Sequence, residues 1–248
     1  MRLLITGTTG FVGRNLKEYF EGRDYQIDCP KRVDQNLLDS ATVQSYLDQG
    51  RFDVVIHCGV TLSSVEENLK MYFNLERCSG LFGRMICVGS GAEFDNRNYI
   101  PNLRVLGIFG KIEGHTRRFI SNNIAGVLSG LDISMNRNVS FDYLYVDDFA
   151  RIVEVFLDSN PQHEIYNTCN GNPVDFLSLA EIIREVHGKD VSIVVKQEGL
   201  GNKYSGDNQL FLTEFGGFEF TGMRTAVGEL YDWHKNSSGI EFHAAMFE

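Results

Sequence analysis

The sequence predicts an α/β protein with a doubly wound parallel sheet and a small lobe contributed by its C-terminal part. Three observations predict this. A glycine-rich turn, Gly7–Gly13, lies between a short apolar run and an amphipathic segment. Apolar runs then alternate with helical patterns through the first half, which is typical of a parallel sheet covered by helices. In the second half the alternation becomes irregular, which indicates a second lobe.

In the first half, strands and helices are predicted in strict succession. The predicted elements are strand Leu3–Ile5, a helix from Phe11, strand Tyr25–Cys29, helix Ser40–Leu47, strand Phe52–Cys58, helix Val65–Leu81, strand Met85–Val88 and strand Leu103–Phe109. We expect Ser40 to be the N-cap of its helix, because a serine hydroxyl accepts hydrogen bonds from first-turn amides.

In the second half, the predicted elements are less evenly spaced. They are helix Phe119–Leu128, an extended segment Ser140–Val146 returning to the sheet, helix Asp147–Leu157, strand Ile165–Cys169, helix Ser178–His187, strand Val191–Val195 and helix Thr225–Trp233. Four apolar residues are expected to face inward from the helix Asp147–Leu157: Phe149, Ile152, Val153 and Phe156. Ser178, with Glu181 three residues on, predicts a capping box.

Composition restricts the class of protein. The chain has 248 residues, 43% of them hydrophobic, and a net charge of −10. Nucleic-acid binding requires a basic face and is therefore not expected. The five cysteines contain no CxxC pair, and no HExxH or zinc-ligand spacing occurs, so we expect buried thiols, a reducing compartment and no metal. No targeting segment and no apolar run long enough for a bilayer is found, so a cytoplasmic protein without a membrane partner is expected.

The glycine turn carries the clearest functional signal. Residues Thr6–Gly13 read T-G-T-T-G-F-V-G. After a strand and before a helix, glycines at this spacing allow a sharp turn, close approach of the backbone to a pyrophosphate, and packing of the helix on the strand. The helix N-terminus then faces the phosphates. The turn therefore predicts a Rossmann-type site for NAD or NADP, and an ordinary glycine-rich turn is the alternative.

Further segments match one family in the same order. They are N-L-L-D (Asn36–Asp39), V-V-I-H-C-G (Val54–Gly59), N-L-K-M-Y-F-N-L (Asn68–Leu75), V-G-S-G-A-E-F (Val88–Phe94), L-R-V-L-G-I-F-G (Leu103–Gly110), F-D-Y-L-Y-V-D-D (Phe141–Asp148) and Y-N-T-C-N-G (Tyr166–Gly171). Together with the glycine turn, they make the chain resemble the extended short-chain dehydrogenase/reductases, in particular the nucleotide-sugar epimerases, dehydratases and reductases. The segment Val88–Phe94 is similar to that of the GDP-fucose synthases.

The resemblance implies a NAD(P)-binding domain over residues 1–110 and 139–170, and a substrate lobe over residues 111–138 and 171–248. It also implies roles for individual residues. The pyrophosphate is expected to be held by Gly7, Thr9, Gly10, Phe11, Val12 and Gly13, the adenine by Asp39, and the adenosine ribose by Cys58 and Gly59. Asn68 matches an asparagine near the cofactor, and Ser90 matches the serine that hydrogen-bonds the reacting oxygen of the substrate. A solvated Asn68 and a simple turn serine at position 90 are the alternatives.

The residues after the second strand bear on the choice of cofactor. Lys31 and Arg32 stand near the position where NAD enzymes place an acid for the ribose hydroxyls. A basic pair there can neutralise a 2′-phosphate, which favours NADP. A solvated surface pair is the alternative.

One element of the family pattern is missing. The chemistry uses a tyrosine with a lysine four residues later, whose charge lowers the pKa of the phenol. Only Gly91–Asn102 lies between Ser90 and the next strand, and this segment has no lysine and no apolar helical face. A parallel crossover needs about a dozen residues or more. The apolar face Leu69, Tyr72, Phe73 and Cys78 would then lack a partner.

Two explanations of the gap stay open. Either a segment between Pro101 and Asn102 is missing from the sequence, which the abrupt join favours, or the protein lacks the pair and is catalytically inactive. The pair Tyr231 and Lys235 has the right spacing, but it lies far from the expected place and is interpreted as chance.

The reaction stays open among 4-reduction, 4-epimerisation and dehydration. Glu93, Asn122 and Arg137 are the candidate substrate contacts of the nucleotide sugar. Ala92 stands where the GDP-fucose synthases use a cysteine for epimerisation, and His115 is a weak candidate for a second acid or base. A homodimer is expected. The rival functions are a non-catalytic NAD(P) sensor and a structural partner that dimerises through the helix Val65–Leu81.

Overall fold

The computed structural model describes residues 1–61, 63–90 and 102–237, apart from the side chains of Ser90, Asn102 and Arg117. The chain divides into two compact units. Unit 1 comprises Met1–Val105 and Ala150–Tyr166, and unit 2 comprises Leu106–Phe149 and Asn167–Glu248. The functional division expected at residues 110, 138 and 170 stays a prediction.

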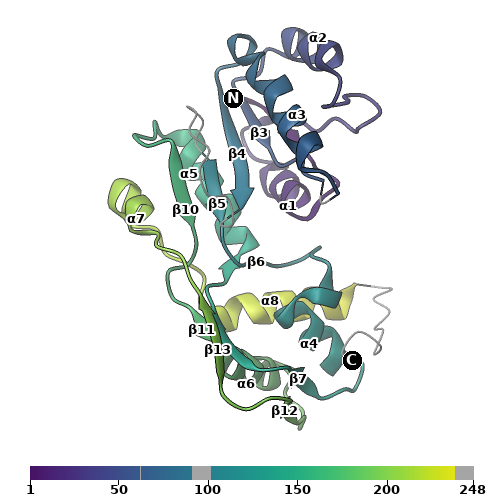
Figure 1. Cartoon of the computed structure of the whole chain (residues 1–248), viewed down its shortest axis with the longest axis vertical. Helices are drawn as coiled ribbons and strands as arrows, with labels where there is room; N and C mark the ends of the chain where they lie inside the picture. The colour runs from purple at the N-terminus through teal and green to yellow at the C-terminus, as the bar shows by residue number, and fades with distance from the viewer. Residues whose placement is uncertain (62, 91–101, 238–248) are drawn as a thin grey trace. The chain divides into compact units, whose positions relative to one another are not determined.

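A six-stranded sheet with the order β10-β5-β4-β3-β1-β2 forms the centre of unit 1 (Figure 1). Its strands are β1 (Arg2–Thr6), β2 (Gln26–Asp28), β3 (Val54–His57), β4 (Arg84–Ser90), β5 (Asn102–Val105) and β10 (Ile165–Thr168). The pairs of β1 with β2 and β3, and of β4 with β3 and β5, are parallel. The predicted doubly wound sheet is therefore confirmed, and its strand order reverses at β1.

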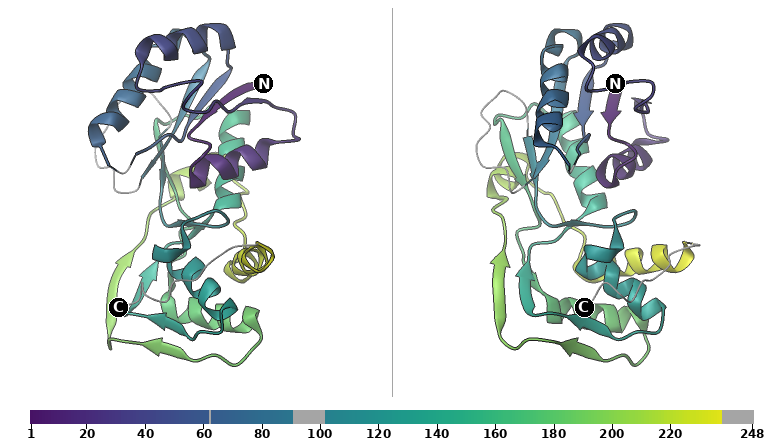
Figure 2. Two further views of the ribbon diagram at one scale, coloured as in Figure 1. Left: turned by 90° about the vertical axis from the view of Figure 1, so that its right-hand side faces the viewer. Right: turned by 45° about the vertical axis from the view of Figure 1, so that its right-hand side comes forward.

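Helices cover both faces of this sheet. They are α1 (Phe11–Phe20), α2 (Ser40–Gly50), α3 (Val65–Glu76) and the part of α5 (Val146–Asp158) that belongs to unit 1. Figure 2 shows α2 and α3 on one face and α1 on the other. Ser64 caps α3, because its Oγ accepts a hydrogen bond from the Glu67 N–H at 3.1 Å. The predicted helix is too long, since α3 ends at Glu76 and only a 3-10 turn, η1 (Ser79–Leu81), follows.

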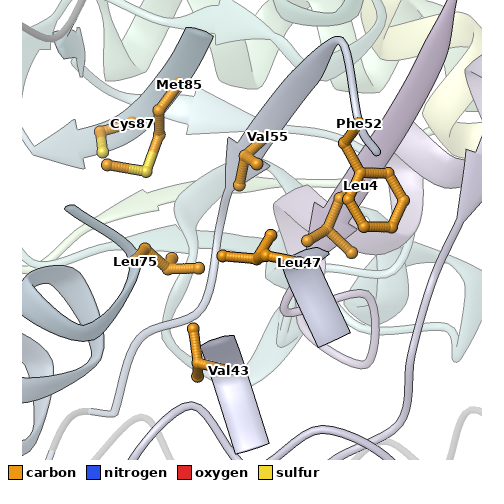
Figure 3. Packing of buried hydrophobic residues seen from close by; sticks show 8 residues of the cluster. All are labelled: Leu4, Val43, Leu47, Phe52, Val55, Leu75, Met85 and Cys87. Atoms are coloured by element: carbon orange, nitrogen blue, oxygen red, sulfur yellow. The ribbon is translucent and has the colours of Figure 1, made fainter. Parts of the chain in front are cut away.

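A buried apolar cluster joins α2 and α3 to the sheet (Figure 3). Its members are Leu4, Val43, Leu47, Phe52, Val55, Leu75, Met85 and Cys87. Tyr72 and Cys78 pack against this cluster, so the expectation that they lack partners is wrong. Leu69 and Phe73, on the other side of α3, are 44% and 42% exposed. The α3 helix therefore keeps an exposed apolar stripe.

Unit 2 contains three helices that pack on one another and several short strands. The helices are α4 (Phe119–Leu128), α6 (Phe176–His187) and α8 (Met223–Asn236), with α7 (Gln209–Phe215) and the 3-10 turn η2 (His115–Arg117). The strands are β6 (Ile108–Phe109), β7 (Ile133–Met135), β8 (Asn138–Phe141), β9 (Leu144–Tyr145), β11 (Val174–Asp175), β12 (Ile193–Val195) and β13 (Leu200–Tyr204). They pair as β11-β8-β13, β12-β7 and β6-β9.

Two strand predictions are wrong in unit 2. The segment Ser140–Val146 does not return to the six-stranded sheet, because β8 pairs with β11 and β13 while β9 pairs with β6. The run Leu103–Phe109 is divided into β5 and β6. Gly107 lies between them at φ +57°, and a Cβ there would lie 1.9 Å from the carbonyl oxygen of Asp142. The chain therefore bends at a position that only glycine can occupy.

Two predictions of helix N-caps are wrong by one and three residues. Asp39, not Ser40, caps α2, and its Oδ1 accepts hydrogen bonds from the N–H groups of Ala41 and Thr42, each at 3.0 Å. Asp175, not Ser178, caps α6 by accepting from the Ser178 N–H at 3.1 Å. A carboxylate accepts two first-turn amides at once and carries the charge that a helix N-terminus favours.

The remaining composition-based expectations concern thiols, metals and membranes. All five cysteines are free, and Cys87 and Cys169 are buried as expected. Within residues 1–61, 63–90 and 102–237, no group of three or more His, Cys, Asp and Glu side chains could hold a metal ion. None of the helices described here has the length and apolar character that crossing a bilayer demands.

Candidate functional site

The glycine turn follows β1 and approaches the end of β3. Gly7 has φ +69°, and a Cβ there would lie 2.6 Å from both the carbonyl carbon and the oxygen of Cys58. A Cβ on Gly13 would lie 2.4 Å from the carbonyl oxygen of Gly7. Contacts this short are sterically impossible, so both positions require glycine. Two of the three roles predicted for the glycines, the sharp turn and the close packing of helix on strand, are thus present.

The helix that follows the turn presents its first turn without a side-chain cap. Gly10 is the N-cap of α1 and has no side chain to bond the first amides. Gly10 and Thr9 are exposed, whereas Phe11 and Val12 are half-buried. Unpaired first-turn amides and the positive end of the helix dipole form an anion site. The residues present therefore fit the pyrophosphate of a dinucleotide.

The turn lies at the point where the strand order reverses. Because β1 has β2 on one side and β3 on the other, the chain leaves the carboxyl ends of β1 and β3 in opposite directions. Doubly wound sheets bind ligands in the crevice that forms there. Cys58 and Gly59 follow β3 directly and lie against Gly7. The structure thus brings the predicted pyrophosphate and ribose residues together at one edge of the sheet.

The two predicted polar contacts on α2 and α3 are engaged within the protein. The Asp39 carboxylate caps α2, and the hydrogen bond from the Thr42 amide lowers the pKa of this exposed group. Asn68 accepts from the Thr61 N–H and donates to the Thr61 carbonyl, both at 2.8 Å. Asn68 therefore fastens the loop after β3, a role that neither sequence interpretation contained. Contact of either residue with a cofactor stays a prediction.

The basic pair lies after β2 and is free to meet solvent. Lys31 and Arg32 are both exposed. The acid at the end of β2, Asp28, is instead bound by Arg2, whose Nη2 donates to Asp28 Oδ2 at 2.7 Å and whose Nε donates at 3.1 Å. After β2, the Asp28 carboxylate is therefore engaged by Arg2, whereas Lys31 and Arg32 are exposed to solvent.

The predicted catalytic serine is only partly described. Ser90 is the last residue of β4, and its backbone is in register with Val105 of the parallel strand β5. Glu93 lies outside the described residues. Residues 91–101 join the two adjacent parallel strands, and they contain no lysine. The Tyr231 and Lys235 pair does not replace the missing one, since burial raises the pKa of Tyr231 and its hydroxyl bonds His187 Nδ1 at 3.0 Å.

Unit 2 has a hollow of about 630 Å³ beside β8 and β13. Arg137 lines it together with Phe141, Gln197, Lys203 and Tyr204. The Phe141 and Tyr204 rings lie 5.0 Å apart, and Arg137 Nη2 donates to Gln197 Oε1 at 3.1 Å. Cations beside aromatic rings suit a phosphorylated planar ligand. Asn122, buried on α4, is not among the lining residues.

Sequence patterns missed a buried polar group in unit 2. Glu113 is 6% exposed, and it follows Ile112, whose φ of +73° is unusual for a branched residue. Ser121 Oγ donates to Glu113 Oε1, and burial raises the pKa of Glu113 to about 7. His234 is 4% exposed, and burial lowers its pKa to about 4. Among the described residues, neither of its ring nitrogens has a hydrogen-bond partner. Neither residue carries a periodic signal that would reveal its burial.

Comparison with known proteins agrees with this arrangement. Residues 1–67 match the RmlD substrate binding domain, and residues 78–169 match the NAD dependent epimerase/dehydratase family. GDP-L-fucose synthase of Azorhizobium caulinodans is 34% identical over 68 residues, which is 27% of this chain and 22% of that protein. The matches to curated relatives therefore span about a fifth of their length.

Solved structures share the fold over nearly the whole chain. A GDP-L-fucose synthetase from Naegleria fowleri bound to NADP has a TM-score of 0.76 at 15% identity, covering 94% of this chain and 93% of that one. UDP-glucose 4-epimerase of Thermus thermophilus, in complex with NAD, has a TM-score of 0.72 at 17% identity, covering 96% and 100%. Two segments of this chain are therefore similar to those two family models, and the chain shares its fold with solved nucleotide-sugar epimerases and synthetases.

Proposed function

We propose that the chain binds NAD(P) at the switch-point crevice and modifies a nucleotide sugar by hydride transfer at the sugar. The observation that carries this proposal is the turn in which Gly7 and Gly13 leave no space for a Cβ. The sharp turn and the close helix–strand packing that these glycines allow present the uncapped N-terminus of α1, where a dinucleotide pyrophosphate would be bound. When bound, the nicotinamide supplies the hydride chemistry, and the protein supplies binding, orientation and proton control. Five free thiols favour a cytoplasmic location.

In this proposal the protein residues act at three places. Gly7, Gly10 and Gly13 admit the pyrophosphate to the amides of α1, and Cys58–Gly59 form the opposite wall. Ser90, at the carboxyl end of β4, would donate a hydrogen bond to the reacting oxygen of the sugar. Arg137 and Lys203, beside the Phe141 and Tyr204 rings, would hold the nucleotide part of the substrate in unit 2. The proposal leaves 4-reduction, 4-epimerisation and dehydration open.

The proposal is tested by binding and turnover together. Fluorescence titration with NADPH and NADH comes first, followed by a screen of GDP-, UDP-, CDP- and dTDP-sugars in which the sugar product is detected by chromatography or NMR. Absorbance at the nicotinamide band would report 4-reduction only, because epimerisation and dehydration return the hydride to the sugar. Turnover of any of these sugars supports the enzyme. Binding without turnover favours the rival reading, a sensor without the Tyr-x-x-x-Lys pair. Absence of binding to both coenzymes contradicts the proposal entirely.

The missing pair can be examined by mass. The sequence has a mass of 28.0 kDa. A natural protein that carries an additional segment with a tyrosine and a lysine between Pro101 and Asn102 must be heavier than this. An intact mass of 28.0 kDa would exclude the extra segment and would favour the non-catalytic NAD(P) sensor over the enzyme.

We further propose that the cofactor is NADP. Replacing Lys31 and Arg32 together by serine is expected to raise the Kd for NADP about tenfold and to leave the Kd for NAD unchanged, because only NADP carries a 2′-phosphate. Arg51→Ser, on another exposed arginine, is the control for a general loss of positive charge. A wild-type protein that binds NAD more tightly than NADP would contradict this assignment.

We also propose that two copies associate through α3. Val65, Leu69 and Phe73 recur at four-residue spacing on one side of the helix and are 75%, 44% and 42% exposed. A stripe on one helix can pair with itself across a two-fold axis. Leu69→Glu with Phe73→Glu is expected to convert a dimer into a monomer in sedimentation velocity. A wild-type protein that sediments as a monomer at micromolar concentration would rule this dimer out.

A further inference from the structure

The strands on either side of the switch point end in a buried polar pair. Thr6 is the last residue of β1 and His57 the last residue of β3, and the two are register partners. They are 2% and 7% exposed. Thr6 Oγ1 and His57 Nδ1 share a hydrogen bond of 2.8 Å. Most other residues of these two strands are apolar and buried, so the pair is a polar contact placed inside the sheet.

The same hydroxyl also binds the backbone that follows β3. The Cys58 N–H donates to Thr6 Oγ1 at 3.2 Å. Directly after Thr6, the chain turns at Gly7, where a Cβ would lie 2.7 Å from the Gly59 nitrogen. The Thr6 side chain therefore connects the end of β1 to the end of β3 and to the backbone that follows it.

The imidazole of His57 supports one of these walls. A Cβ on Gly59 would lie 3.2 Å from His57 Cε1 and 3.1 Å from Leu37 Cδ1. The Leu37 carbonyl accepts a hydrogen bond from Asn74 Nδ2 at 2.8 Å. Burial lowers the pKa of His57 to about 4, so the ring is neutral at physiological pH. Gly59 thus rests on a fixed, uncharged ring.

We propose that Thr6 and His57 are a positioning pair that sets the width of the crevice and thereby the affinity for the coenzyme. The inference rests on the proposed function, since it concerns the same crevice. The pair acts through the backbone of Gly7, Cys58 and Gly59 and does not itself touch reacting atoms. Displacements of about 1 Å in residues that only position a ligand have large effects on binding and catalysis.

The test compares two substitutions of Thr6. Thr6→Val keeps the shape of the side chain and removes the hydroxyl, whereas Thr6→Ser keeps the hydroxyl. We expect the Kd for NADP to rise roughly five- to tenfold in Thr6→Val, as the loss of one or two hydrogen bonds predicts, and to stay near the wild-type value in Thr6→Ser. His57→Leu, which removes Nδ1 from the other side of the bond, is expected to weaken binding to a similar extent.

A control separates positioning from stability. Val43→Ala creates a cavity in the cluster beneath α2, to which neither Thr6 nor His57 belongs. All titrations are made well below the melting temperature of the least stable variant. We expect Val43→Ala to keep the wild-type Kd while its melting temperature falls. Equal Kd values for wild type and Thr6→Val, or equal weakening in Val43→Ala, would overturn the positioning role. A wild-type chain that binds neither coenzyme would instead overturn the proposed function, and this inference with it.

Discussion

Gly7→Ala is expected to abolish coenzyme binding and to destabilise unit 1 by about 3 kcal/mol or more. The alanine would have to adopt φ +69°, which costs roughly 1–2 kcal/mol for an L-residue. Its Cβ would in addition lie 2.6 Å from the backbone of Cys58, and overpacking of this kind costs about 1–3 kcal/mol. Relief requires that β1 and β3 separate, so the Kd for NADP should rise at least about a hundredfold.

Urea denaturation and NADPH fluorescence measure the two effects. Gly80→Ala is the matched control, because its Cβ would meet nothing within 4 Å and its φ is not in the left-handed region. It should keep both the wild-type stability and the wild-type Kd. Gly10→Ala should have an effect between those of Gly7→Ala and Gly80→Ala, because its Cβ would lie 3.3 Å from the Gly7 oxygen, a tight contact. Wild-type binding by Gly7→Ala would remove the main support for the dinucleotide site.

Acidification from pH 7 to 4.5 is expected to lower the free energy of unfolding by about 2 kcal/mol. Burial lowers the pKa of His57 and His234 to about 4, from 6.5 in the unfolded chain. Below pH 6.5 the unfolded state therefore binds two more protons at these sites, which together removes roughly 5 kcal/mol by pH 4.5. Glu113 acts in the opposite direction. Its pKa is raised from 4.5 to about 7, so the folded state gains about 3 kcal/mol over the same range.

Glu113→Gln separates these contributions. Glutamine can still accept the Ser121 hydroxyl but does not titrate, so the stabilising effect of acid is lost. The variant should lose about 5 kcal/mol between pH 7 and 4.5, compared with about 2 kcal/mol for wild type. Smaller shifts at Asp142 and His187 have opposite signs and partly cancel. Chemical denaturation at half-unit pH intervals measures both slopes, and equal slopes would show that Glu113 is ionised in the folded protein.

The sheet of unit 1 could be predicted because its signals are local. The β1 strand, the glycine turn and α1 form one continuous pattern in unit 1, and in unit 2 the α4 helix likewise begins and ends where its apolar run does. The inward positions of Ile152, Val153 and Phe156 are confirmed, since all three are fully buried. Hydrophobic periodicity and glycine spacing depend on residues that are close together in the sequence. They predict these elements well, because the elements form mainly through such local interactions.

The helices α4, α6 and α8 of unit 2 were predicted, but the pairing of its strands could not be, because this pairing depends on distant segments. The strand β13 (Leu200–Tyr204) is largely exposed and contains glycine and lysine, yet it pairs with β8. Residues 200–204 form a strand because they pair with β8, and no pattern within these residues predicts that pairing. The buried Glu113 and His234 were missed for a related reason, since a polar residue shows its burial only when the elements around it are known.

The candidate site was predicted in part. The glycine turn, the wall Cys58–Gly59 and the basic pair after β2 follow from sequence spacing and a family resemblance. The Thr6 and His57 contact does not, because it needs the register of two strands that are fifty residues apart in the chain. Once the parallel pairing of β1 with β3 is assumed, a histidine at the end of an apolar strand opposite a threonine is the signal that could have revealed it.

Unit 1 is assembled from two separated stretches of sequence, and this has a consequence for synthesis. When residues 1–105 have left the ribosome, the apolar surface of the sheet that receives Ile152, Val153 and Phe156 still faces water. The outer edge of β5 also lacks its neighbour β10 until residue 168 has been made. A nascent chain of this kind exposes apolar surface for the time needed to translate some sixty more codons. We therefore expect chaperones to bind it during synthesis. Recombinant fragments that stop before residue 150 should aggregate for the same reason.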